Sequence, residues 1–274
     1  MDIFAEVTDR IIEQLNQGII PWQKPWIARG AAISHVTGKP YSILNQLMLR
    51  KPGEYLTYNQ CKAEGGCVRK GEKAQMVVFW KFIDREDADT HETVKVPLLR
   101  YYRVFHVSQC EGIKEKHLSP LPGTAESDDA ADAIITDYIS REGVTLQEVE
   151  GNSAFYQPFT DSVTVPTKAQ FTETAEFYST VFHELTHSTG HEKRLNRLDK
   201  VACFGSDDYS KEELVAEIGA AALVNHVGLE TAKSFRNSAA YLQNWLTVLR
   251  SDKHFIVSAA GKAEKAVNLI LGAA

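Results

Sequence analysis

The stretch FHELTHSTGH, residues 182–191, places two histidines four positions apart with a glutamate directly after the first. It lies in an amphipathic run that follows Thr172, a residue type that often caps a helix, and acidic residues stand in its first turns, where they favour a helix N-terminus. Residues i and i+4 share one face of a helix. The pattern therefore predicts a helix that presents His183 and His187 side by side.

Two imidazoles on one helix face can bind the same divalent ion, with Zn–N distances of about 2.0–2.1 Å. Glu184 lies beside them, where it can take a proton from a water that the ion activates toward a peptide carbonyl. We therefore expect His183 and His187 as ligands of one Zn²⁺ ion, or of another divalent metal, and Glu184 as the catalytic base. The alternative is a helix that carries two histidines by chance, because a five-residue pattern is short.

A catalytic zinc site needs a third protein ligand. His191 comes too early for the spacing of a third histidine in metzincins and is expected to lie at the end of the helix. The run YSKEELVAEIGAAALVNH, residues 209–226, predicts a second helix with Glu213 and Glu217 one turn apart. We expect Glu213 as the third ligand and Glu217 as the carboxylate that orients a ligand histidine, while the reverse assignment stays open.

A competing interpretation exists for Glu213, because Ser210-x-x-Glu213 also matches a capping box that would close the helix N-terminus. Glu217 lies deeper among apolar residues, where a carboxylate needs a histidine or a metal as its partner. An HExxH helix followed by a helix with Glu-x-x-x-acid resembles the gluzincin metallopeptidases, which usually stabilise the oxyanion with a tyrosine or histidine. The candidates for that role are Tyr156, Tyr209 and His226.

The N-terminal part of the chain has a different character. Residues 18–81 contain ten basic residues and three acidic ones, although the whole chain has a net charge of −6. Aromatic rings interleaved with cations are typical of proteins that bind single-stranded nucleic acid, because bases stack on the rings and cations offset the phosphates. The clearest pieces are PWQKPW (21–26), TGKPY (37–41) and VRKGEK (68–73). The alternative is that rings such as Phe79, Trp80 and Trp22 pack in a core and the lysines are simply solvated.

The order of elements predicts an α+β fold class. We expect a first helix that ends at Gly18, a short helix within residues 55–66, and two or three strands in 75–84 and 93–110. The stretch LSPLPGTAESDD, residues 118–129, has almost nothing to bury and is predicted to be a linker. A helix at 129–142 follows, and then short strands and a long helical region. The predicted domains are 1–117, the linker 118–129 and 130–274.

Neither a transmembrane helix nor an export signal is expected. No apolar run approaches the ~18 residues that would span a bilayer, and acids stand where a signal peptide would carry lysines. The four cysteines are scattered, which favours reduced thiols. These features predict a cytoplasmic protein without a membrane partner.

In sequence order, several stretches together resemble the ArdC family of antirestriction proteins from conjugative plasmids and related mobile elements. The N-terminal domain of that family also occurs in TraC-type primases. The stretches include GIIPWQKPW (18–26), RYYRVFHVSQCEG (100–112), AFYQPFTDSVTVP (154–166) and FGSDDYSKEELVAEIGAA (204–221).

This resemblance implies an N-terminal domain that binds single-stranded DNA and a C-terminal, mainly helical, zincin-like metallopeptidase domain. It implies His183, His187 and Glu213 as metal ligands and Glu184 as the catalytic base. The positions that match the DNA-binding pattern of the family are Trp22, Lys24, Trp26, Lys39, Tyr41, Asn45, Arg69, Lys70 and Lys73.

The expected function is that of an antirestriction-type protein of a mobile element, which binds single-stranded DNA and cleaves an unidentified protein substrate with a zinc-dependent site. The alternative is a non-catalytic protein that shields single-stranded DNA and whose zinc site is structural or vestigial. A third hypothesis makes the first segment a protein-interaction module that delivers the peptidase to a partner.

Overall fold

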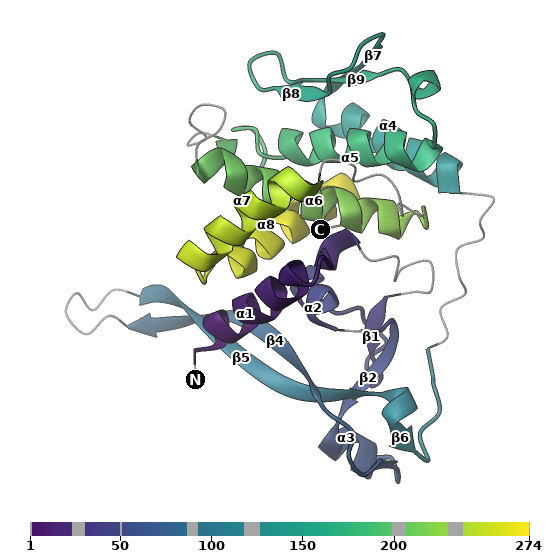
Figure 1. The fold of residues 1–274 in the computed structure, drawn as a ribbon, viewed down its shortest axis with the longest axis vertical. Helices are drawn as coiled ribbons and strands as arrows, with labels where there is room; N and C mark the ends of the chain where they lie inside the picture. The colour runs from purple at the N-terminus through teal and green to yellow at the C-terminus, as the bar shows by residue number, and fades with distance from the viewer. Residues whose placement is uncertain are drawn as a thin grey trace. The chain divides into compact units, whose positions relative to one another are not determined.

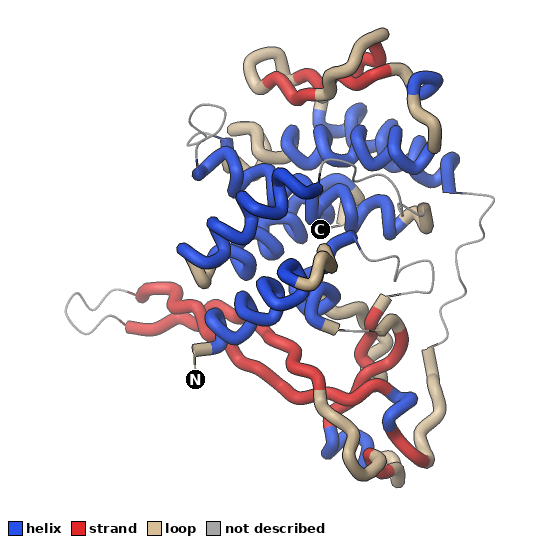
Figure 2. The backbone as a smooth tube through the Cα atoms, in the orientation of Figure 1, coloured by secondary structure: helices blue, strands red, loops and turns tan. Residues whose placement is uncertain are grey.

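The computed structural model describes residues 2–23, 31–49, 51–86, 93–117, 127–198, 207–229 and 238–273. It divides into two compact units. The first unit comprises Met1–Glu6 and Ala31–Ser119, and the second comprises Val7–Gly30 and Pro120–Ala274. Strands dominate the first unit and helices the second (Figure 2), which confirms the predicted α+β class. The domain limits 1–117 and 130–274 stay a prediction, and most of the predicted linker lies outside the described residues.

A four-stranded sheet forms the first unit. Its strands are β1 (Ala32–Ser34), β2 (Gly53–Thr57), β4 (Gln75–Glu86) and β5 (Thr93–His106), in the order β1-β2-β5-β4. The pair β1 and β2 is parallel, and the other two pairs are antiparallel. The predicted strands in 75–84 and 93–110 are confirmed as β4 and β5, which run side by side along their length (Figure 1).

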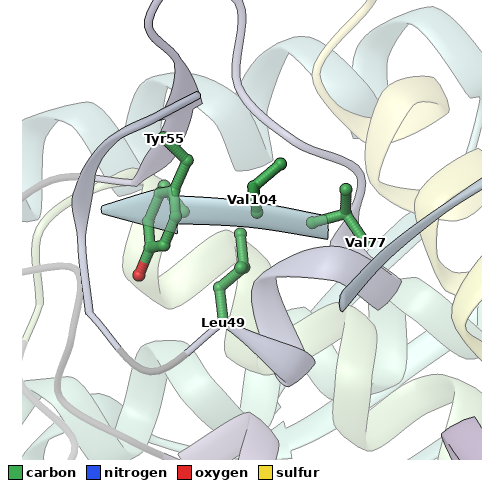
Figure 3. Packing of buried hydrophobic residues seen from close by; sticks show 5 residues of the cluster. Leu49, Tyr55, Val77 and Val104 are labelled. Carbon is green, nitrogen blue, oxygen red and sulfur yellow. The ribbon is translucent and has the colours of Figure 1, made fainter. Parts of the chain in front are cut away.

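The core of this sheet lies under the short helix α2 (Ile43–Met48) and the residue that follows it. The buried cluster consists of Ala32, Leu49, Tyr55, Val77 and Val104, most of which are labelled in Figure 3. β4 is an edge strand, and the buried Asn45 side chain bonds its free edge: Nδ2 donates to Val78 O and Oδ1 accepts from Val78 N, each at 2.8 Å. An edge strand leaves backbone N–H and C=O groups without a partner strand. At Val78, the Asn45 amide takes the place of that partner.

The helix predicted within residues 55–66 is shorter than expected. Its first residues belong to β2, because Tyr55 and Leu56 are fully buried and pair with β5. The helix α3 (Tyr58–Ala63) then begins with a capping box between Thr57 and Gln60. A second, small sheet pairs β3 (Cys67–Val68) with β6 (Cys110–Glu111), after the 3-10 helix η2 (Val107–Gln109).

The end of the first unit is held by a buried carboxylate. Glu54, 2% exposed, accepts the backbone N–H of Lys116 at 2.8 Å and that of His117, and it is also hydrogen-bonded to the buried His35. Burial would raise the pKa of Glu54, but these hydrogen bonds outweigh it and lower the pKa. The segment that leads to the predicted linker is therefore tied to the sheet.

In the second unit, helices lie against a small sheet. The helices are α4 (Ser127–Glu142), α5 (Thr174–Ser188), α6 (Asp207–His226), α7 (Ser238–Ser251) and α8 (Phe255–Ile270). The strands β7 (Thr145–Val149), β8 (Phe155–Gln157) and β9 (Ser162–Pro166) follow the order β7-β9-β8, and the 3-10 helix η3 (Lys168–Gln170) precedes α5. The predicted helix at 129–142 and the predicted short strands after it are confirmed. Within the described ranges, no helix has both the length and the apolar character needed to cross a membrane.

Most of the first helix belongs to the second unit, not the first. From Val7 onward, α1 (Ile3–Asn16) belongs to the second unit, with Val7, Ile11 and Leu15 at most 1% exposed. Thr8 Oγ1 donates to Lys253 O at 2.6 Å. Gly18 ends the helix as predicted, with a φ of 72° that a side chain disfavours. The 3-10 helix η1 (Pro21–Gln23) then packs against the same unit.

Candidate functional site

The predicted histidine pair lies on α5, whose apolar face is buried in the second unit through residues that include Phe177, Val181 and Leu185. His183 and His187 present their imidazoles together, with Nε2 atoms 3.1 Å apart and ring centroids 4.8 Å apart. Both side chains are largely buried, at 18% and 13% exposure. The i, i+4 spacing therefore brings the rings together as predicted.

Glu213 of α6 reaches both rings. Its Oε2 lies 3.5 Å from His183 Nε2, and its Oε1 lies 3.4 Å from His187 Nε2. The helix begins at Asp207, three residues before Ser210, so Glu213 stands too far inside it to be the N3 residue of a capping box. The structure thus decides against that interpretation of Glu213.

The three donor atoms fit one divalent ion. Two atoms that bind an ion at about 2.05 Å with a tetrahedral angle between them lie about 3.3 Å apart. The two Nε2 atoms, 3.1 Å apart, match this value, and each lies 3.4–3.5 Å from one of the two Glu213 oxygens. With one oxygen of Glu213 as the third donor, all three atoms lie within 4.8 Å of one another. Among the described residues, His183, His187 and Glu213 form the one group of three or more side chains whose donor atoms converge in this way. Two imidazole nitrogens and a carboxylate are also the ligand chemistry of catalytic zinc sites.

Further carboxylates lie behind the two rings. Glu217 Oε1 is 3.8 Å from His183 Nδ1, and Glu212 Oε1 is 3.6 Å from His187 Nδ1. Glu212 also receives two hydrogen bonds from Arg197, from Nε at 3.2 Å and from Nη2 at 2.7 Å. Glu217 was expected in this role from the sequence, whereas Glu212 and Arg197 were not. The one available signal was the acid that directly precedes Glu213.

Arg197 also holds the end of α5. It donates to Thr186 O at 2.9 Å and to Thr189 Oγ1 at 2.8 Å, and its side chain is 7% exposed. One guanidinium therefore joins the C-terminus of the histidine helix, the loop that follows it and the carboxylate behind His187. Such contacts fix the orientation of a ligand ring.

The charges of the site favour a cation. Burial alone would lower the pKa of both histidines, but the neighbouring carboxylates outweigh it: Glu212 and Glu213 raise the pKa of His187 to about 10, and Glu213 raises the pKa of His183. Despite its burial, the same contacts hold the pKa of Glu213 well below its usual range. Burial raises the pKa of Glu217.

Glu184 and His191 are not among the converging side chains. Glu184 is 7% exposed on α5, and its charge acts on both His183 and His187. His191 lies after the helix, outside the converging group, and its Nδ1 accepts the N–H of Lys193 at 3.1 Å. The side chain of Tyr209 lies outside the described residues.

Tyr156 is engaged in a different network. Its hydroxyl donates to Asp161 Oδ1 at 2.7 Å, and Arg194 donates to the same hydroxyl at 3.3 Å. Arg194, 2% exposed, pairs with both oxygens of Asp161 and donates to Ser188 O at 2.8 Å. The network therefore ties the hairpin of β8 and β9 to the end of α5, and the Tyr156 hydroxyl serves that packing.

The predicted DNA-binding residues are not all alike in their surroundings. Trp22 is 2% exposed in the second unit, edge-on to Trp245 at 5.1 Å, and Asn45 is 1% exposed at the edge of β4. Lys24 and Trp26 lie outside the described residues. In the first unit, Tyr41 is half-buried, and the exposed predicted cations are Lys39, Arg69, Lys70 and Lys73. Their role in DNA binding stays a prediction.

The expectation that Phe79 lies in the core is wrong. Its side chain is 48% exposed, and its ring lies edge-on to that of Tyr102 on β5, which is 45% exposed. Phe79 follows the buried Val77 on the same strand face. In the sequence, both positions fit the pattern of a core strand, and nothing there indicates that the buried region ends between them.

Two family models match the chain. Residues 1–105 match the N-terminal domain of anti-restriction factor ArdC, and residues 131–262 match a zincin-like metallopeptidase.

Two solved structures are similar over nearly the whole length. Both are crystal structures of the antirestriction protein ArdC from plasmid R388. The metal-free structure is 36% identical with a TM-score of 0.78 and covers 98% of this chain and 97% of its own. The Mn(II)-bound structure is 34% identical with a TM-score of 0.80 and covers 100% of this chain and 98% of its own.

Curated relatives include two DNA primase TraC proteins of Escherichia coli, each 34% identical over 97% of this chain. The chain spans 27% and 19% of their lengths. The uncharacterized protein y4eC of Sinorhizobium fredii (strain NBRC 101917 / NGR234) is 32% identical over 96% of this chain and 90% of its own length.

Proposed function

The chain belongs to the ArdC family of antirestriction proteins, and on that premise we propose that its second unit is a zinc-dependent peptidase and that its first unit binds single-stranded DNA. The observation that carries the peptidase proposal is the convergence of His183 Nε2, His187 Nε2 and Glu213 at separations that suit one ion. We infer zinc because nitrogen-rich sites bind Zn²⁺ more tightly than Mn²⁺.

In this proposal, His183, His187 and Glu213 hold the ion. When bound, a divalent ion polarises a peptide carbonyl and lowers the pKa of water. Glu217 and Glu212 face the Nδ1 atoms of the two rings, and this fixes which nitrogen faces the ion. The ligand rings are thereby oriented before any substrate arrives.

Glu184 is the proposed general base. It directly follows His183 on the same helix and is nearly buried, and a carboxylate there can accept a proton from the attacking water and return it to the leaving amine.

The proposal for the first unit rests on its cations and rings. Lys39, Lys70 and Lys73 are exposed, whereas Arg69 is also engaged with Glu72 and Ser108 O. Exposed cations next to exposed rings suit a single strand, whose phosphates need positive charge and whose bases offer flat faces. In an antirestriction protein, binding to single-stranded DNA would bring the peptidase close to a protein that is bound to the same DNA.

The peptidase proposal is tested by Glu184→Gln. We expect the wild-type protein, loaded with zinc, to cleave an unfolded reporter protein in the presence of single-stranded DNA. The variant should lose cleavage at least a hundredfold and keep its metal content by elemental analysis, whereas His187→Ala should lose both. Equal cleavage by wild type and Glu184→Gln would reject the proposed base.

If neither protein cleaves while both hold the metal and bind DNA, the non-catalytic shielding protein becomes the better description. The metal itself is tested by competition between Zn²⁺ and Mn²⁺ for the metal-free protein. Preference for Mn²⁺ at equal concentrations would reject zinc.

A further inference from the structure

Strands β4 and β5 carry a row of exposed aromatic side chains on one face. The rings of Phe79 and Tyr102 have centroids 5.3 Å apart at an angle of 82°. The ring centroid of Tyr41, from the loop before α2, lies 6.5 Å from that of Phe79, and Tyr41 also packs against the buried core cluster. Three rings thus follow one another from the core of the first unit to its surface.

The register explains why these rings share a face. Phe79 pairs with Arg100 and Val77 pairs with Tyr102 across the two strands. Because side chains alternate along a strand, all four point to the side that also holds the buried Val104. The covering layer ends there: Val77 is fully buried, and Phe79, two residues further on, is 48% exposed.

The charges around this row favour a polyanion as its occupant. Arg100 is exposed directly opposite Phe79. The described side chains of β4 and β5, in residues 75–79 and 100–106, include two exposed arginines and no acid; Arg100 shares the face of the rings, and Arg103, opposite Met76, lies on the other face. An apolar protein partner would not call for this excess of positive charge, whereas a strand with exposed bases requires both rings and cations.

We propose that Tyr41, Phe79 and Tyr102, with Arg100, form the surface on which the bases of single-stranded DNA stack. This proposal rests on the proposed DNA-binding function of the first unit and names its contact surface. It differs from the sequence-based residue set, since Trp22 and Asn45 are buried and Phe79 and Tyr102 were not in that set. Duplex DNA would bind more weakly, because its base faces are already stacked on one another.

The test uses the full-length protein and a fluorescently labelled oligothymidine, with binding followed by anisotropy. Phe79→Ala and Tyr102→Ala should each weaken binding roughly ten- to hundredfold, as expected for the loss of one base–ring contact. Phe79→Tyr and Tyr102→Phe keep a ring and should bind as tightly as the wild type. Tyr101→Ala is the matched control, because Tyr101 neighbours Tyr102 but pairs with Val78 on the opposite face.

A second probe separates stacking from charge. An oligonucleotide of the same length without bases keeps every phosphate, so the wild type should prefer oligothymidine, and the double variant Phe79→Ala/Tyr102→Ala should bind both alike. The slope of log affinity against log salt should stay unchanged in the ring variants and become shallower in Arg100→Ala.

The outcomes distinguish this inference from the function on which it rests. If the wild type does not bind the oligonucleotide, the proposed DNA-binding function fails. If the wild type binds and the ring variants, folded by circular dichroism, bind equally well, the stacking surface alone is overturned. A loss in Tyr101→Ala as large as that in Tyr102→Ala would also overturn it, because the effect would then not belong to this face.

Discussion

Gly219 of α6 lies directly against Thr186 of α5. A Cβ at Gly219 would stand 2.7 Å from Thr186 Cγ2 and 2.8 Å from its Oγ1. Thr186 is fully buried, and its hydroxyl donates to Phe182 O at 2.7 Å, so it has little freedom to move away. Thr186 directly precedes His187, and Gly219 lies on the helix that carries Glu213. The close approach of these helices therefore sets the distance between ligands on different elements.

Gly219→Ala should weaken metal binding by forcing the two helices apart. The added methyl group meets a β-branched side chain, which should cost about 1–3 kcal/mol of stability as overpacking does elsewhere. Zinc affinity, measured by competition with a chromophoric chelator, should fall together with the free energy of unfolding in urea. Gly261→Ala on α8 is the control, because no atom lies within 4 Å of its Cβ; it should raise stability by about 0.5–1 kcal/mol and leave zinc affinity unchanged.

Arg197→Met should reduce zinc affinity about 10- to 100-fold, because Glu212 loses the partner that aims it at His187. Glu212→Gln should have a similar effect, and the double variant should be less than additive, since both changes disrupt one contact. Fully additive losses would contradict this coupling. Arg141→Met, which changes an arginine paired with Asp137 and Glu142, should leave the affinity unchanged.

Asp161→Asn should destabilise the second unit by on the order of 2–3 kcal/mol at pH 7, since it leaves the buried Arg194 without its anion. Burial would raise the pKa of Asp161, but Arg194 and Tyr156 outweigh it and lower the pKa. A carboxylate with a lowered pKa stabilises the fold above its unfolded pKa of about 3.9, and this contribution is lost as pH falls through the folded pKa. The difference between wild type and variant in urea unfolding should therefore be constant near neutral pH and shrink below about pH 4. Asp137→Asn, in an exposed pair with Arg141, should cost less than about 0.5 kcal/mol at any pH.

Trp22→Ala should lower the free energy of unfolding by about 3–5 kcal/mol, because it empties a buried site against Trp245. Trp22→Phe should recover part of this loss. A loss of stability alone would not support the prediction that Trp22 contacts DNA. For that, the folded fraction of the variant would also have to lose affinity for an oligonucleotide. Unchanged affinity at reduced stability would leave Trp22 with a packing role alone.

The sequence was most informative where chemistry depends on local spacing. The histidines of α5 lie four residues apart, and helix geometry alone places their rings together. Glu213 was placed on the correct helix, but the start of that helix was predicted too late. Asp207 begins it, and the competing capping box with Ser210 arose from this error.

Contacts that join distant segments were out of reach. Nothing in the sequence near Arg197 indicates that the loop after α5 folds back to Glu212. Val77 and Phe79 hold equivalent positions in the strand pattern, although only Val77 is buried. The asparagine that bonds the edge of β4 was identified by its resemblance to a family position, without a physical role. Its hydrogen bonds to Val78 supply that role.

Fragments of this protein should stay associated through α1, because most of that helix packs in the second unit. A single proteolytic cut within residues 118–126 severs the chain but leaves Val7, Ile11 and Leu15 buried in the other piece. The two products should therefore co-elute on a sizing column until a denaturant separates them. For the same reason, a recombinant piece that ends at residue 117 would carry an amphipathic helix deprived of its docking site, and a piece that starts at residue 130 would lack the helix that covers it.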